Sequence, residues 1–226
     1  MFWIVDAWLH YDERRLQEMQ RRASAAIHEQ IEHAKTSSAD TFRVGVSYHP
    51  EQSKIEAAEF VKQLADLEGA DNLSLQIEWL PQTDEFLEQI KSLTGLKDLH
   101  LDCCEMNERG AECIASFPHL ETLYLTKMQI TDTAIEKLEA APALSELWLA
   151  PSNETGLTIP TVLALPHLRK LTLSGFYSSW FHSQLKQLER ATMLTELTLT
   201  YIQPAEVDGL RAQLPDCVIT ARVNEK

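Results

Sequence analysis

The segment that decides the fold is LETLYLTKMQITDTAIEKL, at residues 120–138. Its first half has the pattern LxxLxL, typical of a strand whose side chains alternate between two faces, so Leu123 lies opposite to Tyr124. In the second half, Asp132 is a good helix N-cap, and apolar residues from Ile135 onward return with helical spacing. The segment therefore predicts one strand followed by one short helix.

The same pattern recurs along the chain at a nearly constant period. Full copies are spaced 24 residues apart, with a last step of 26, and begin at Leu96, Leu120, Leu144, Leu168 and Leu194. A degenerate copy with Leu75 and Ile77 stands one step earlier. A fixed period of this length indicates units that pack on their neighbours along one axis. The sequence therefore predicts a solenoid.

With its Ile-Thr-Asp turn at 130–132, this repeat resembles the leucine-rich repeat, and it is most similar to the α/β, ribonuclease-inhibitor-like subclass. The resemblance covers residues 72–219, and the tail at 214–219 is similar to a last half-repeat. It implies an α/β solenoid with a parallel sheet on the concave side, helices on the convex side, and protein binding as the general role. Residues 150–162 and 174–183 depart from the pattern, so we expect irregular convex turns there.

The first 71 residues do not show the repeat. Their apolar spacing predicts a long amphipathic helix over 12–35, a strand over 42–48 and a helix over 55–67. With the strand at 73–79, the last two elements form a βαβ order that extends the parallel sheet. We therefore divide the chain into an N-terminal helical cap (1–71), which covers the open end, and a solenoid (72–226), together one continuous domain.

Composition and charge restrict the function. The chain of 226 residues has 20 Lys and Arg against 34 Asp and Glu, a net charge of −14, which excludes nucleic acid as a partner and favours a basic protein. The four cysteines are too few for a disulfide framework and fit buried positions in a reducing cytoplasm. We expect a cytoplasmic monomer.

Residues 1–9 form a short apolar segment. We interpret it as an apolar edge that docks on the domain or, alternatively, as the exit of a membrane anchor whose upstream part is missing.

Motifs for catalysis, metals or cofactors do not occur. The eight histidines have neither HxxxH nor HExxH spacing on a helix, and the glycine-rich phosphate motifs are missing. A catalytic Cys103 or Cys104 beside His100 is a weak alternative. We therefore expect no catalytic residues, no metal and no cofactor, and no enzyme activity.

The candidate site lies on the concave sheet face, where strand alternation places an exposed column beside the leucines. His100, Tyr124 and Trp148 occupy consecutive rungs about 4.8 Å apart and form an aromatic ridge. Carboxylates surround it, opposed by one cation. The candidate partner-binding residues are His100, Tyr124, Trp148, Asp98, Asp102, Thr122, Glu146, Lys170 and Thr172. In the alternative interpretation the rings only stack and stabilise the sheet.

A second candidate is the aromatic insertion Phe176, Tyr177, Trp180 and Phe181, which otherwise fills the space left by an irregular repeat. The favoured hypothesis is a protein-interaction module that binds a partner, possibly basic in charge, through the acidic, aromatic concave face. Three alternatives remain open: an inhibitor or antidote that masks a basic enzyme, a structural membrane-tethered repeat protein, and an enzyme that uses the solenoid as a scaffold.

Overall fold

The computed structural model describes residues 71–80, 82–150, 157–174, 184–202 and 204–223, the strand at 42–47, and single residues at 29, 61, 62, 64 and 65. Eight strands form one sheet in chain order, and every neighbouring pair is parallel. The strands are β1 (Phe42–Ser47), β2 (Leu73–Glu78), β3 (Leu96–Asp102), β4 (Thr122–Thr126), β5 (Glu146–Ala150), β6 (Lys170–Leu173), β7 (Glu196–Ile202) and β8 (Val218–Val223).

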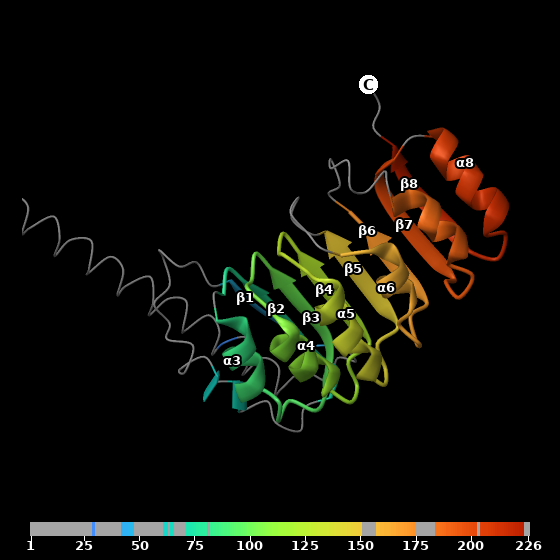
Figure 1. The fold of residues 1–226 in the computed structure, drawn as a ribbon. Helices are drawn as coiled ribbons and strands as arrows, with labels where there is room; N and C mark the ends of the chain where they lie inside the picture. The colour runs from blue at the N-terminus through green and yellow to red at the C-terminus, as the bar shows by residue number, and fades with distance from the viewer. Residues whose placement is uncertain are drawn as a thin grey trace, which may run out of the picture.

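Helices connect successive strands and lie side by side on one face of the sheet (Figure 1). They are α3 (Thr83–Gln89), α4 (Glu108–Ala115), α5 (Asp132–Lys137) with the 3-10 helix η1 (Leu138–Ala140), α6 (Ile159–Leu163), the 3-10 helix η2 (Leu185–Arg190) and α8 (Pro204–Gln213). One strand and one helical segment per repeat, paired in sequence order, give the α/β solenoid that the repeat predicts.

The leucines of the repeat form the core. Leu99, Leu123 and Leu147 are register partners on β3, β4 and β5, and each is 0% exposed. Burying one such side chain contributes about 1.5–3 kcal/mol. A slip of one residue would turn these leucines to the other face. The predicted register is therefore confirmed, and with it the face on which the candidate site lies.

Side chains cap the N-termini of both α4 and α5, and in α5 the cap differs from the predicted residue. Asn107 caps α4, because its side-chain oxygen accepts from the backbone N of Arg109 at 2.8 Å. In α5 the N-cap is Thr131, which accepts from the backbone N of Ala134 at 3.2 Å. The prediction of Asp132 as the cap is wrong, because its carboxylate turns to donors in the next repeat.

The irregular repeats have shortened helical segments. Helix α6 spans five residues and contains Pro160, and the following repeat has the 3-10 helix η2 in place of an α-helix. Both observations agree with the expected irregular convex side, although residues 151–156 and 175–183 lie outside the described residues. The aromatic insertion falls within the second of these gaps.

At the N-terminal end, β1 pairs in parallel with β2, as the βαβ order predicts. Residues 61, 62, 64 and 65 are helical, and Leu64 is 1% exposed against the core. Of the predicted helix over 12–35, only position 29 is among the described residues, so the helical cap and the division into 1–71 and 72–226 stay predictions.

A turn that the sequence analysis missed follows β2, β3 and β4. The first residue after each strand, Trp79, Cys103 or Lys127, has a φ of 57°, 53° or 51°. This left-handed backbone conformation is unfavourable for residues other than glycine. It persists because each backbone N continues the sheet ladder, donating to the next strand at 2.7–2.9 Å. The turn places these three side chains at the same edge of the sheet.

Candidate functional site

The ridge face is the sheet face that carries the predicted central column. Strand pairing aligns its members one above another, namely Gln76, His100, Tyr124, Trp148, Thr172 and Thr198. The consecutive rungs His100, Tyr124 and Trp148 were predicted in this order. The structure therefore brings the three candidate aromatic residues together in one column.

The three rings contact one another along the column. The ring centroids of His100 and Tyr124 are 3.7 Å apart with an angle of 14° between the planes. Trp148 follows at 5.3 Å from Tyr124 and is tilted by 32°. The rings are half-buried rather than exposed as predicted, because each covers part of its neighbour. The ridge thus stabilises the sheet by cross-strand stacking and still offers aromatic surface.

One flanking column carries alternating polar and charged side chains. Asp98, Thr122, Glu146, Lys170 and Glu196 are aligned by the same strand pairing. The ammonium of Lys170 lies 2.8 Å from the carboxylate of Glu196, and this pairing raises the pKa of Lys170. Among the described residues, no lysine or arginine pairs with Asp98 or Glu146. Glu146 is the register partner of Lys170 and its charge adds to the raised pKa of Lys170, so Asp98 is the carboxylate on this side without a cationic partner among the described residues.

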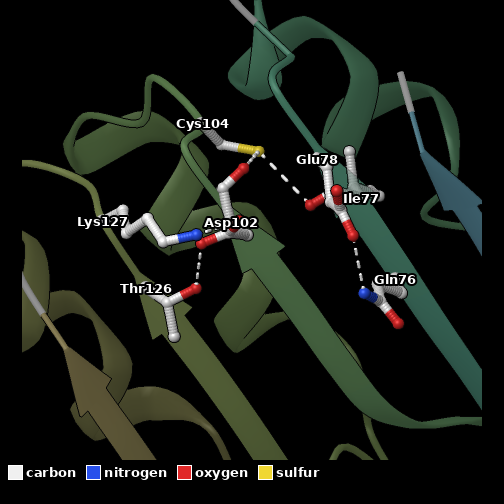
Figure 2. Close-up of polar contacts among 7 residues, drawn as sticks. All are labelled: Gln76, Ile77, Glu78, Asp102, Cys104, Thr126 and Lys127. Carbon is white, nitrogen blue, oxygen red and sulfur yellow. Dashed lines mark hydrogen bonds and ion pairs between the residues drawn. The ribbon is translucent and has the colours of Figure 1, made fainter. Parts of the chain in front are cut away.

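On the other side of the ridge, Asp102 is engaged by its neighbours (Figure 2). Its carboxylate accepts from the Thr126 hydroxyl at 2.5 Å and lies 3.1 Å from the Lys127 ammonium. The hydrogen bond and charge of Asp102 raise the pKa of Lys127. Lys127 is a second cation near the ridge, which the sequence analysis missed because it considered only positions within the strands.

The adjacent cysteines differ in environment. Cys104 is buried, and its thiol donates to the carbonyl oxygens of Ile77 at 3.6 Å and Asp102 at 3.4 Å (Figure 2). Cys103 is half-buried, so the prediction that all four cysteines are buried is wrong for it and for Cys217. Burial raises the pKa of both adjacent thiols, which keeps them protonated near neutral pH. This environment does not activate either cysteine as a nucleophile.

A cavity of about 550 Å³ opens beside the ridge face, where β3 and β4 end. It is lined by the three left-handed residues and the loops that follow them: Trp79, Cys103, Cys104, Glu105, Met106, Lys127, Met128 and Gln129. Trp79 is 45% exposed there. The sequence analysis missed this cavity. The only available signal was an aromatic residue directly after the degenerate first repeat strand.

The described part of the chain shows neither a metal cluster nor a membrane span. No group of three or more His, Cys, Asp or Glu side chains gathers there in a way that could hold a metal ion. No helix among these residues is both long enough and apolar enough to cross a bilayer.

Comparisons with known proteins add little beyond the fold. No protein-family model and no curated protein matches the sequence. Fifteen solved chains match in structure. One is an internalin of Listeria monocytogenes, which is 12% identical with a TM-score of 0.42; the match covers 93% of this chain and 66% of the internalin, slightly under two thirds. The α/β solenoid is therefore assigned from the repeat and the strand register described above.

Proposed function

We propose that this protein is a protein-interaction module that binds a partner protein through the ridge face, which the repeat predicts to be concave. The observation that carries the proposal is the ridge itself. His100, Tyr124 and Trp148 occupy three consecutive rungs of one column, in mutual contact and only half-buried. The module acts by binding, without a catalytic residue, metal or cofactor.

The ridge has the chemistry of an interface centre. Tyr and Trp bury a large area with few rotatable bonds and keep a polar atom for hydrogen bonding, so they dominate the binding energy of many interfaces. Because the rings already stack on one another, their side chains lose little conformational entropy when a partner covers them. Thr122 and Thr172 lie next to the rings and supply small polar contacts at the rim.

Charge favours a basic partner. Asp98 flanks the ridge without a cationic partner among the described residues, Glu146 and Glu196 share the single cation Lys170, and the whole chain has a net charge of −14. Complementary charge accelerates association and excludes acidic competitors. This observation also supports the second candidate function, an inhibitor that masks a basic enzyme, whose affinity would fall steeply between low and high salt.

The test uses the full chain as bait in lysate of its own cells, beside a Tyr124→Ala/Trp148→Ala variant. The matched control is His119→Ala/His167→Ala, which removes two exposed rings from turns outside the sheet. The proposal expects one protein that the wild type and the control recover and the folded ridge variant loses. Equal recovery by all three forms would contradict it. Release of that protein by salt would favour the inhibitor function.

A further inference from the structure

The cavity beside the ridge face combines features that the ridge does not explain. Trp79, Cys103 and Lys127 all line it, and each is held in the left-handed conformation directly after its strand. Strained backbone of this kind is unfavourable in free energy and concentrates at functional sites. Three consecutive repeats thus each contribute a non-glycine left-handed residue to the lining of one cavity.

The lining offers both apolar and acidic surface. Trp79 is 45% exposed, and the half-buried Met106 supplies apolar wall, with the buried Met128 beneath it. Glu105 contributes a carboxylate, and its backbone N is fixed by donation to the Leu80 carbonyl at 3.2 Å. Among the described residues, Glu105 has no lysine or arginine partner.

The resident cation does not neutralise this lining. Lys127 is held by Asp102 at 3.1 Å, and Glu78 lies at the end of the neighbouring strand. The charges of Asp102 and Glu78 add to burial in raising the pKa of the Cys103 thiol, as expected in a negative local potential. An anionic ligand would be repelled here. A cationic ligand would find Glu105 available.

We propose that this cavity accepts an arginine side chain of the partner protein, with its guanidinium group flat against Trp79 and paired with Glu105. The proposal rests on the proposed function, because the cavity adjoins the ridge face through Asp102. The arginine methylenes pack against Met106. A planar guanidinium stacks on an indole and pairs with a carboxylate at once, which the compact ammonium of lysine does less well.

The test is a titration of the full-length, ¹⁵N-labelled protein, in the absence of any partner, with N-acetyl-arginine amide. The Trp79 indole signal is assigned with the Trp79→Phe variant. N-acetyl-citrulline amide, which has nearly the same shape without the charge, is titrated at matched ionic strength. Free arginine, which has a charged amino group and a charged carboxylate, is titrated as well. A site for an arginine residue within a polypeptide should prefer the capped form, whereas a small-molecule site should prefer free arginine.

The proposal expects the capped arginine to shift the Trp79 signal in a saturable manner and the citrulline to leave it unchanged. Glu105→Gln should weaken the binding about three-fold or more, whereas Glu121→Gln, an exposed carboxylate outside the cavity, should not. The proposal is overturned if no shift saturates, if citrulline binds equally, if Glu105→Gln has no effect, or if free arginine binds tighter than the capped form. Because no partner is present, these outcomes are independent of the test on the ridge.

Discussion

The carboxylate of Asp132 joins two neighbouring repeats, because it accepts hydrogen bonds from both the backbone N of Thr158, at 2.7 Å, and its hydroxyl, at 3.0 Å. The equivalent acidic residues of the two preceding repeats form similar links. Asp84 accepts from the backbone N of Asn107 at 3.2 Å, and Glu108 accepts from the Thr133 hydroxyl at 2.7 Å. An acid in the first turn of α3, α4 and α5 thus fixes the start of the next helix.

This linkage predicts that Asp132→Ala lowers the free energy of unfolding by about 1–3 kcal/mol, because it leaves donors of Thr158 without their acceptor in a half-buried place. Glu136→Ala, at an exposed position of the same helix, is the control and should change it by less than about 0.5 kcal/mol. Urea denaturation measures both. Equal effects of the two substitutions would show that the linkage does not contribute to stability.

Two glycines in helices provide an opposed pair of predictions. A Cβ at Gly110 would lie 2.2 Å from the Oδ1 atom of Asp84 and 2.5 Å from the Met106 side chain, whereas a Cβ at Gly209 meets nothing within 4 Å. Gly110→Ala should therefore destabilise the protein by about 1–3 kcal/mol. Gly209→Ala should stabilise it by about 0.5–1 kcal/mol through helix propensity. Thermal unfolding of both variants decides, and a stabilised Gly110→Ala would refute the close packing of α4 on the first repeat.

Protonation of Cys113 predicts a pH dependence of stability. Burial and the hydrogen bond to Glu88 raise the pKa of this thiol to about 11, against about 8.5 in an unfolded chain. Between these two values the native state keeps a proton that the unfolded state has lost, so Cys113 makes stability fall as pH rises. Unfolding measured from pH 8 to 10.5 should show a smaller decline for Cys113→Ala than for the wild type. Parallel curves would exclude this contribution.

Neighbouring residues of β5 should separate the core from the site. Leu147→Ala removes a fully buried leucine and should cost about 2–5 kcal/mol of unfolding free energy. Trp148→Ala removes a half-buried ring that contacts Tyr124 and should cost about 1 kcal/mol or less. Denaturant titrations of the two variants test this. A larger loss for Trp148→Ala would mean that the ridge is chiefly structural.

The fold could be predicted from the sequence because the leucine period and the strand alternation act together. A slip of one residue would bury Tyr124 and expose Leu123, so a single register satisfies all five copies. The order of the ridge column follows from that register. Its half-buried state does not, because it depends on how far His100, Tyr124 and Trp148 cover one another, which residue spacing leaves undetermined.

Contacts between repeats could not be predicted from the sequence. The left-handed turns at Trp79, Cys103 and Lys127 depend on backbone hydrogen bonds to the next strand, and no glycine marks them. For the same reason the cavity could not be predicted. Asp132 has the residue type and position of an N-cap, and only the placement of Thr158 in the next repeat explains its actual role.

The most direct test of the central claim is the affinity of Trp148→Ala for the recovered partner, measured by calorimetry on the purified proteins. The account predicts a loss of about 2 kcal/mol, or roughly thirty-fold in Kd, with the variant still folded. Unchanged affinity in a folded Trp148→Ala protein would contradict binding through the ridge face.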